Sequence, residues 1–378
     1  MNKIKIAHIL NSVGGVDVSL RLILTNIDSS KFENIVVHSN DDTDVPYLDN
    51  AENPIKDYKL PIKREISVFK DFAAIFNALK ILRKEKPQVI HAHSAKGGVI
   101  GKIVGFILKT PVLHTPQAYS YLSAETSFKQ RLYLFVERCF RGFNNKILAS
   151  SVSEKNRAIE EVGYKKENVL LFNNSINPIS DIEDLSIKKT WPDYYICSVG
   201  RPSYQKNIEL MLDVLVEVKK TLPQVHLVLM GVGYHSPSLN TVKEIIKQQN
   251  LDTNVTLLEW TSRNDIFNII KSSQLYISTA RYEGLPYSVI ESLALKKAIV
   301  ATDADGNRDL VENNYNGYLI QNEDKFKFSE GIIKLISAND INIKFSENSL
   351  KLFNSKFDIN KNIIKLEKIY CEQLKQYY

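Results

Sequence analysis

Short apolar runs separated by helical segments recur along this chain of 378 residues, and they fall into two series. Runs of this kind, apolar on both faces and rich in β-branched residues, are typical of strands buried in a parallel sheet. Helical patterns lie between them, for example at 18–27, 69–85, 98–108 and 128–143. The first series of predicted strands is KIKIAHIL, NIVVHS, PQVIHAH, PVLHT, KILAS and NVLLF, and the second is YYICSVG, VHLVLMG, NVTLLEW, QLYISTA, KAIVATD and NGYLI.

A polar stretch with two prolines, NPISDIEDLSIKKTWPDY, separates the two series. Since repeated strand–helix units build parallel sheets covered by helices, we predict an α/β protein with two doubly wound, Rossmann-like domains facing across a cleft. Ligands of such sheets bind outside the carboxyl ends of the strands, so a ligand site is expected there. The predicted division is an N-terminal domain at 1–180, a linker at 181–192, a C-terminal domain at 193–355 and a closing segment at 356–378.

Composition and charge exclude several classes of protein. The 49 Lys and Arg residues against 43 Asp and Glu give a net charge of +6, which is weak evidence for an anionic partner. No basic run interleaved with aromatic residues indicates a nucleic-acid binder. Cys139, Cys197 and Cys371 are scattered without a CxxC pair, which argues against a disulfide framework or a zinc site. The apolar run in MNKIKIAHILNS is too brief for a signal peptide, and no run reaches transmembrane length, so we predict a cytoplasmic protein.

Two glycines, Gly14 and Gly15, follow the first predicted strand and precede a helix. Such a turn lets backbone N–H groups and the positive end of a helix approach a phosphate closely. The sequence is not GxGxxG, and no ribose-binding acid follows the second strand, so a nicotinamide site is poorly supported. A tight strand-to-helix turn without a ligand remains the alternative.

Two cations, Arg201 and Lys206, lie in VGRPSYQKN at the expected carboxyl end of the first strand of the second series. Cations beside helix-terminal amides suit a pyrophosphate, whose negative charge grows as it leaves. The alternative is a solvated loop with two ordinary charges.

Two acids, Glu283 and Glu291, flank a Gly-Leu-Pro turn in ARYEGLPYSVIESLALKKAIVATD. QLYISTA predicts a strand, so Glu283 lies in the loop at its carboxyl end, where a carboxylate can accept hydrogen bonds from sugar hydroxyls. Gly284 relaxes the turn, and Pro286 suits the first turn of the helix that carries Glu291. That second carboxylate can hold a ribose diol. Two surface acids are the alternative, which the strand and the turn between the acids disfavour.

The motifs, taken in order, resemble those of the retaining glycosyltransferases of family 4, also called group 1. In the second half these motifs are RPSYQKN, LVLMGVG, EGLPYSVIE and DADGNRDLVENNYNGYLI, with the family's E-x7-E spacing between the two glutamates. The first half matches more loosely, through the glycine turn, VIHAHSAKGG and SVSEKNRA. NKNIIKLEKIYCEQL resembles the family's closing helix, which crosses back to the N-terminal domain.

The resemblance implies the GT-B fold, with a nucleotide-sugar donor bound mostly by the C-terminal domain and the acceptor on the N-terminal side. It implies catalytic roles for Glu283, Arg201 and Lys206, with no metal and no other cofactor, and transfer on one face of the sugar. The donor-binding residues that it implies are Gly14, Gly15, Gln117, Gly231, Gly284, Leu285, Pro286, Tyr287, Ser288 and Glu291.

The chain also departs from the family pattern. Gln117, in PVLHTPQAYSYLS, stands where the family commonly has a histidine that contacts the donor sugar, and His114 lies three residues earlier. An amide can replace the hydrogen bond of a histidine but not its charge. Glu259, Lys296 and Asp305 stand at positions where the family often has glycine.

The predicted activity is transfer of a sugar from a nucleotide-sugar donor, expected to be a UDP-sugar, to a hydroxyl of a saccharide acceptor. The resemblance favours a lipid-linked acceptor in the assembly of bacterial surface polysaccharides. A GT-B-fold sugar-nucleotide epimerase and a non-catalytic nucleotide-sugar-binding protein are the alternatives. Product analysis separates them, because only a transferase makes a new glycoside.

Two further features of the first half have open interpretations. His91 and His93 lie at a strand end among apolar residues, which favours a structural role over ligand binding. The helix in SFKQRLYLFVERCFRGF has one apolar face and several cations, with Glu137 as a local acid. Packing of that face on the sheet is favoured, and the cations predict reversible docking on an anionic membrane.

Overall fold

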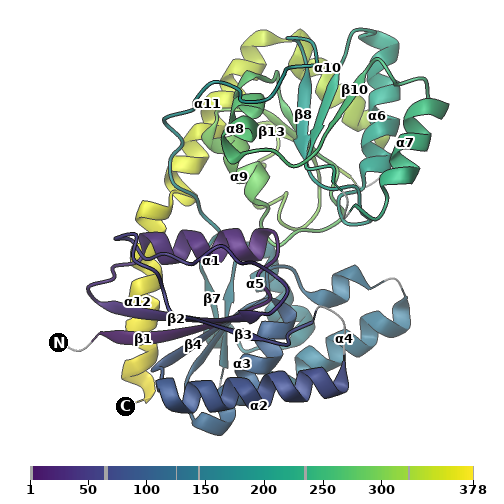
Figure 1. Cartoon of the computed structure of the whole chain (residues 1–378). Coiled ribbons are helices and arrows are strands. Elements are labelled where there is room, and N and C mark those ends of the chain that lie inside the picture. The colour runs from purple at the N-terminus through teal and green to yellow at the C-terminus, as the bar shows by residue number, and fades with distance from the viewer. Residues whose placement is uncertain are drawn as a thin grey trace. The chain divides into compact units, whose positions relative to one another are not determined.

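The computed structural model describes residues 3–63, 67–124, 126–143, 145–233, 236–321 and 324–377. The chain divides into two compact units, Met1–Asn177 with Asp358–Tyr378 and Pro178–Phe357. Each unit contains one parallel sheet with helices on both faces (Figure 1). The prediction of two Rossmann-like α/β domains is therefore confirmed.

The sheet of the N-terminal unit has the strand order β3-β2-β1-β4-β5-β6-β7. The six strands predicted for this half are present, and the pairing is parallel throughout, with His8 of β1 in register with His91 of β4. The strand β3 at the edge was not predicted, because DYKL is short, polar and largely exposed. The strands are β1 (Ile4–Ile9), β2 (Phe32–Ser39), β3 (Asp57–Leu60), β4 (Val89–His93), β5 (Val112–Thr115), β6 (Asn145–Ala149) and β7 (Val169–Leu171).

Helices cover both faces of this sheet (Figure 1). α1 and α12 pack on one face through a core that includes Ile23 and Leu366, and α2 and α3 pack on the other through Ala78 and Val104. The helices are α1 (Gly15–Asn26), α2 (Val68–Glu85), α3 (Ser94–Leu108), α4 (Ser127–Phe140), α5 (Val152–Arg157), which continues as a π-helical turn at Ala158–Val162, and α12 (Ile359–Tyr377). Short 3-10 turns lie at Ser120–Ser123 and Lys166–Asn168.

The sheet of the C-terminal unit has the order β10-β9-β8-β11-β12-β13, so β8 and β11 are neighbours although helices and two strands separate them in sequence. All six predicted strands are present: β8 (Ile196–Val199), β9 (Leu227–Met230), β10 (Val255–Leu258), β11 (Tyr276–Ser278), β12 (Ile299–Thr302) and β13 (Gly317–Ile320). The helices are α6 (Ile208–Thr221), α7 (Leu239–Gln248), α8 (Arg263–Ser272), α9 (Tyr287–Ala294), α10 (Lys325–Ser337) and α11 (Asn339–Lys356).

The largest core of the C-terminal unit joins α6, α7 and α10 to one face of the sheet, with Leu212, Val214 and Ile332 fully buried. α8 and α9 lie on the other face (Figure 1). The predicted linker 181–192 contacts α8, since the Ser186 N–H donates to the Asp265 carboxylate at 2.7 Å. Among the helices in the described ranges, none is both long and apolar enough to cross a membrane.

Candidate active site

Glu283 lies in the loop after β11, and its carboxylate contacts two side chains from the loop after β8. The Lys206 ammonium lies 2.7 Å from Glu283 Oε1, and Gln205 Nε2 donates to Oε2 at 3.0 Å. The two loops adjoin because β8 and β11 are neighbours in the sheet. The Glu283 side chain is only 10% exposed. Water therefore screens the pair little, and the two charges interact strongly.

A third loop, after β12, fixes the backbone of Glu283. The Glu283 N–H donates to the carbonyl of Asp305 at 3.1 Å. Gly306 has a φ of 78°, and a Cβ at this position would lie 2.7 Å from Glu283 Cβ and 3.0 Å from Pro286 Cδ. Glycine is therefore required at 306 by both conformation and space. Gly306 was not predicted as a site residue, although it lies in the motif DADGNRDL.

The predicted cations lie at the same edge of the sheet as Glu283. Arg201 is half-buried and follows Gly200 at the end of β8. The aliphatic stem of Lys206 packs on Gly200, since a Cβ there would lie 3.0 Å from Lys206 Cδ. The structure thus brings Lys206 and Glu283 into direct contact, and a diphosphate on Lys206 would share that ammonium with the glutamate.

The turn between the two glutamates is tightly packed. Gly284, Leu285 and Pro286 are buried, whereas Tyr287 and Ser288 are half-buried. Pro286 is the N-cap of α9, with an extended backbone at φ −70°. The N-terminus of α9, with its positive dipole end, therefore lies at the same carboxyl edge as Glu283.

Glu291 is buried in α9 and pairs with Arg263 of α8. The residue is 5% exposed, and Arg263 Nη2 donates to Glu291 Oε1. Burial raises the pKa of the Glu291 carboxyl to about 7, although the charge of Arg263 opposes this shift. Arg263 was not predicted, because nothing in the sequence indicates that α8 and α9 are adjacent.

Trp260, which was not predicted as a site residue, lies over the predicted donor-binding residue Gly231. Gly231 has a φ of 83°, and a Cβ added there would lie 3.6 Å from the indole ring of Trp260. A Cβ added at Gly233 would lie 2.7 Å from the same ring. Trp260 follows β10 and is 64% exposed. An indole face is thus supported by glycine backbone and open to a ligand.

In the N-terminal unit, Gly14 and Gly15 form the predicted turn between β1 and α1. Gly14 is the N-cap, with φ 60° and ψ −129°, a conformation that favours glycine. A Cβ added at Gly14 would meet nothing within 4 Å. The glycine is therefore required by backbone conformation, and the turn leaves room for a ligand at the helix N-terminus.

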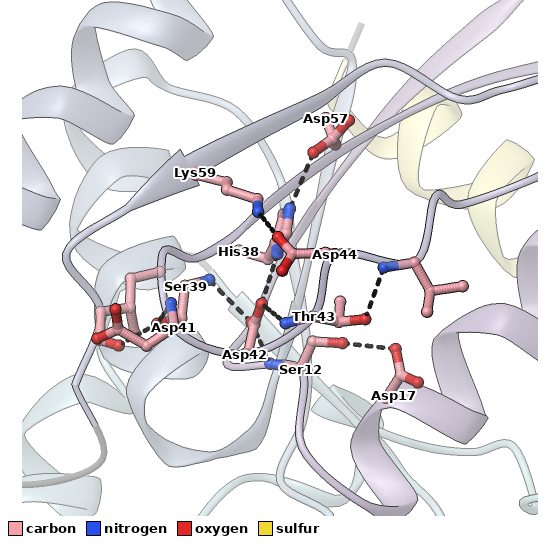
Figure 2. A network of polar contacts seen from close by, with 12 residues as sticks. Ser12, Asp17, His38, Ser39, Asp41, Asp42, Thr43, Asp44, Asp57 and Lys59 are labelled. Atoms are coloured by element: carbon pink, nitrogen blue, oxygen red, sulfur yellow. Dashed lines mark hydrogen bonds and ion pairs between the residues drawn. The ribbon is translucent and has the colours of Figure 1, made fainter.

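A buried network ties this turn to the end of β2 (Figure 2). His38 Nδ1 lies 2.7 Å from Asp42 Oδ1, and Nε2 lies 3.0 Å from Asp57 Oδ2. Asp42 Oδ2 accepts hydrogen bonds from the backbone N–H groups of Ser12 at 2.7 Å and Ser39 at 2.9 Å. The Asp42 carboxylate therefore joins the ends of β1 and β2.

The same network favours the charged form of His38. Burial opposes a charge on the ring, but hydrogen bonds to Asp42 and Asp57 raise the pKa of His38 above its ordinary value. Ser12 Oγ donates to Asp17 at 2.6 Å and accepts from the Tyr47 hydroxyl at 2.6 Å. Ser12, two residues before Gly14, is thus held by both its backbone and its side chain.

Gln117 follows β5 in a conformation that is rare for a residue with a Cβ. Its φ is 55°, and that of Ala118 is 75°. Both polar atoms of its amide are buried and have no hydrogen-bond partner among the residues that the structure describes. His114 cannot take its place, because its ring packs on Gly98 of α3 and contacts the Ser94 carbonyl at 3.0 Å.

His91 and His93 lie beside His8 on the sheet face covered by α1 and α12. Five of the six ring nitrogens of these residues have hydrogen-bond partners: His8 Nδ1 lies 3.1 Å from His93 Nε2, His8 Nε2 contacts Asn34, and His91 contacts Tyr370 and Thr115. Burial lowers the pKa of His8 to about 4 and that of the other two rings well below 6.5. These internal contacts support the structural role that the sequence favours over metal binding.

The apolar face of α4 does not pack on the sheet, contrary to the interpretation that the sequence favours. Phe128 is 77% exposed and Phe135 is 63% exposed. α4 instead packs through Leu134 and through Glu137, which forms a buried ion pair of 3.3 Å with Lys102 of α3. Glu137 therefore does not offset the cations on the surface of α4.

Known proteins resemble this chain over nearly its whole length. The family model "Glycosyl transferases group 1" matches residues 181–352, and "Glycosyl transferase 4-like domain" matches residues 14–175. A UDP-Gal:alpha-D-GlcNAc-diphosphoundecaprenol alpha-1,3-galactosyltransferase of Escherichia coli is 24% identical over 394 residues, covering 99% of this chain and 98% of the relative. The capsular polysaccharide biosynthesis glycosyltransferase CapM of Staphylococcus aureus is 24% identical, covering 100% and 99%.

Solved structures share the fold. Sucrose-phosphate synthase from Thermosynechococcus elongatus superposes with a TM-score of 0.82 at 16% identity, covering 99% of this chain and all of the other. Anabaena HepE in complex with UDP and glucose gives a TM-score of 0.78 at 18% identity, covering 97% and 99%.

Proposed function

This chain belongs to the group 1 glycosyltransferases, and on that premise we propose that it moves a sugar from a UDP-sugar to a hydroxyl of a lipid-linked saccharide, with retention of configuration. The observation that carries this proposal is the assembly of Glu283, Lys206 and Gln205 at the carboxyl edge of the C-terminal sheet. The assembly places a carboxylate for sugar hydroxyls beside a cation for the diphosphate.

The diphosphate is proposed to bind where Arg201 and Lys206 meet the N-terminus of α9. Negative charge on the diphosphate increases as the bond to the sugar breaks, so cations and helix-terminal amides there stabilise the transition state more than the bound donor. Lys206 contacts Glu283 in the structure. A bound donor would replace this contact with two others, from its diphosphate to Lys206 and from its sugar hydroxyls to Glu283. Gly14 and Gly15, in the N-terminal unit, stay predicted donor-binding residues.

Retention follows if the acceptor hydroxyl attacks on the face from which the diphosphate leaves. In this scheme the acceptor oxygen forms a bond to the anomeric carbon while the bond between that carbon and the diphosphate oxygen breaks. The hydroxyl proton passes to the leaving phosphate. The Glu283 carboxylate holds the sugar hydroxyls and favours positive charge developing on the sugar ring. No nucleophile from the protein is needed, and we propose that the cations make a metal ion unnecessary.

The nucleoside is proposed to lie between Trp260 and Glu291. An exposed indole supported by glycine backbone suits stacking on a uracil ring. The Glu291 carboxylate accepts hydrogen bonds from the ribose diol when it is ionised. UDP as the carrier is supported by the name of the relative from Escherichia coli and by the UDP bound in the Anabaena structure.

The lipid-linked acceptor is supported by the same relative, whose name specifies a sugar on diphosphoundecaprenol. An acceptor of this kind lies at a membrane, and two helices of the N-terminal unit present surfaces that suit one. On α2, Phe69, Phe72 and Phe76 lie on one helical face and are 90%, 69% and 69% exposed. On α4, Phe128 and Phe135 are exposed as well.

Cations accompany the exposed aromatic residues. A hollow of about 310 Å³ on α2 is lined by Phe76, Leu79, Lys80, Arg83 and Lys84. On α4, Lys129 and Arg131 are exposed. Basic residues near an anionic lipid surface contribute about 1 kcal/mol each, and interfacial aromatic side chains add to this. We therefore propose reversible docking on the inner face of the cell membrane.

Vesicle flotation tests the membrane contact. The protein is expected to bind phosphatidylglycerol vesicles at low salt and to leave them as salt rises, while Phe69→Ser, Phe72→Ser and Phe76→Ser together weaken binding. The control is Phe326→Ser, which removes an aromatic side chain of 60% exposure from the C-terminal unit. No binding at low salt, or equal binding to phosphatidylcholine at all salt concentrations, would remove the docking proposal and leave the transferase proposal intact.

Product analysis tests the activity itself. The protein is incubated with a panel of UDP-sugars and a sugar-diphosphate lipid acceptor, and we expect UDP and a new glycoside in equal amounts. The rate should persist in EDTA; a loss that Mg²⁺ or Mn²⁺ restores would contradict the metal-free mechanism. UDP without a glycoside would favour an epimerase, and intact donor after long incubation would favour a binding protein.

A further inference from the structure

The loops that follow β8 and β11 in the C-terminal unit are joined by hydrogen bonds to the backbone. The hydroxyl of Thr279, a residue that is 1% exposed, donates to the carbonyls of Lys206 and Asn207 at 3.0 and 2.9 Å. The Arg281 N–H donates to the carbonyl of Gln205 at 2.9 Å. The loop after β8 is therefore fixed against the loop after β11, and the Gln205 side chain starts from a defined place.

The Gln205 side chain forms a further bridge between these loops. Its amide Nε2 donates to Glu283 Oε2 at 3.0 Å and to the carbonyl of Tyr282 at 3.3 Å. Both partners are acceptors, so only the NH₂ end of the amide can face them, and each of its two hydrogens has a partner. Because the amide is neutral, it holds Oε2 without cancelling the charge of the carboxylate.

The other oxygen of the same carboxylate has a different environment. Glu283 Oε1 is buried and lies 2.7 Å from the Lys206 ammonium, but no described residue makes an aligned hydrogen bond to it. Buried polar atoms are nearly always hydrogen-bonded, so this acceptor calls for a donor that a ligand supplies. A sugar hydroxyl is such a donor, and its hydrogen bond to a carboxylate is charge-assisted.

We propose that Gln205 is a positioning residue for catalysis, which holds Oε2 of Glu283 and so keeps Oε1 directed at a hydroxyl of the transferred sugar. The inference rests on the proposed function and gives the two oxygens of Glu283 separate roles. Without the amide, the carboxylate is free to turn toward the Lys206 ammonium and to pair with it through both oxygens. A misdirected carboxylate lowers the rate, because stabilisation of the transition state depends on groups that are held in place beforehand.

Turnover and UDP affinity, measured on the same variant, test this role. Gln205→Leu is close in size to the parent side chain and lacks the amide. Because one hydrogen bond to a charged group is lost, kcat with the most active UDP-sugar of the product-analysis panel should fall about tenfold. The dissociation constant for UDP, which carries no sugar, should stay within about twofold of the parent. A residue that only supports the loop would instead affect UDP binding, since Lys206 lies in the same loop.

A double-mutant comparison shows whether the effect passes through Glu283. In a Glu283→Ala background the amide has no carboxylate to hold, so Gln205→Leu should change the single-turnover rate no further. Tyr204→Ala is the matched control, because Tyr204 precedes Gln205, is 63% exposed, and lies with its ring 4.4 Å from the Arg281 guanidinium. It perturbs the same loop and keeps the amide, so kcat should stay within about twofold of the parent.

Parental kcat in a folded Gln205→Leu variant would overturn the inference alone. Equal losses of kcat and UDP affinity, or a loss of rate that persists undiminished in the Glu283→Ala background, would do the same. If Gln205→Leu does not fold, Gln205→Asn replaces it: its amide is one methylene shorter and withdraws from Oε2, so the same loss of kcat is expected. Absence of transfer by the parent from every donor would overturn the proposed function and this inference with it.

Discussion

The carboxyl edge of the C-terminal sheet pairs its charged groups with one another, whereas that of the N-terminal sheet leaves a polar group unpaired. In the C-terminal unit Glu283 contacts Lys206, and Glu291 contacts Arg263. In the N-terminal unit the charged groups serve the scaffold: Asp42 and Glu154 hold backbone N–H groups, and the Gln117 amide has no partner among the described residues. The paired charges of the C-terminal edge suit a ligand with a fixed diphosphate and ribose.

The largest effect that this comparison predicts is at Glu283. Glu283→Gln should lower kcat for transfer by at least about 100-fold, because charge-assisted hydrogen bonds to sugar hydroxyls contribute about 1.5–3 kcal/mol each. Tm should change little. The control is Glu312→Gln, which breaks a Lys356 pair of 3.0 Å elsewhere in the same unit. Near-parental turnover by Glu283→Gln would place the sugar elsewhere.

Removal of the cations should have the next largest effect. Lys206→Ala and Arg201→Ala should each weaken UDP binding by about tenfold and slow transfer further, since charge on the leaving group is greatest in the transition state. Calorimetric titration with UDP measures the first effect and single-turnover kinetics the second. If both variants bind UDP as the parent does, the diphosphate does not lie at this edge.

Glu291 tests whether the C-terminal edge is built for binding at the expense of stability. Its folded pKa of about 7 lies above the ordinary value of 4.5, so the native protein favours the protonated form and loses stability as pH rises from 4.5 to 7. Glu291→Gln has no carboxyl to ionise and does not lose this stability. Its free energy of unfolding at pH 8 should exceed that of the parent by up to about 3 kcal/mol. At pH 4 the two should be equal.

The same substitution should weaken UDP binding at pH 8. We expect the affinity of the parent for UDP to decline below pH 7 as Glu291 is protonated, and the affinity of the variant to show no such decline. Denaturant unfolding and UDP titration across this range give both quantities. A Glu291→Gln variant that is less stable than the parent at pH 8 would show that the Arg263 pair outweighs burial.

The smallest effect is expected at His38, which acts on the scaffold of the N-terminal edge. His38→Gln should slow transfer only severalfold, because the ring reaches the Gly14 turn through Asp42. The folded pKa of His38 is raised, so its contribution to stability is complete below pH 6.5 and is lost as pH rises through the folded pKa. The variant should therefore lose more Tm at pH 6 than at pH 9. An equal loss at both would show that the ring charge does not matter.

The sequence predicts the strands that are apolar and the loops that follow them, and it fails where a feature depends on a neighbour distant in sequence. β3 is short and polar, so it was missed, and with it Asp57, which contacts His38. Nothing in the sequence around Trp260 and Gly306 indicates a role for them. The structure shows that Trp260 packs on Gly231 and that Gly306 packs against Glu283.

Two helices show the same limit. A serine and an acid three residues apart, Ser151 and Glu154, indicate a helix start, and Ser151 does accept from the Glu154 N–H, but the Glu154 carboxylate also reaches Ala118 in another loop. The periodicity of α4 shows an apolar face and leaves open what covers it. In the structure Glu137 is buried against Lys102, and Phe128 and Phe135 of that face are exposed.

Hydrogen–deuterium exchange of the intact protein with and without UDP tests the central claim, that the carboxyl edge of the C-terminal sheet holds the nucleotide. We predict that UDP slows exchange at 200–207 and 284–291. Protection by UDP confined to the N-terminal unit, with none at 200–207 or 284–291, would contradict it.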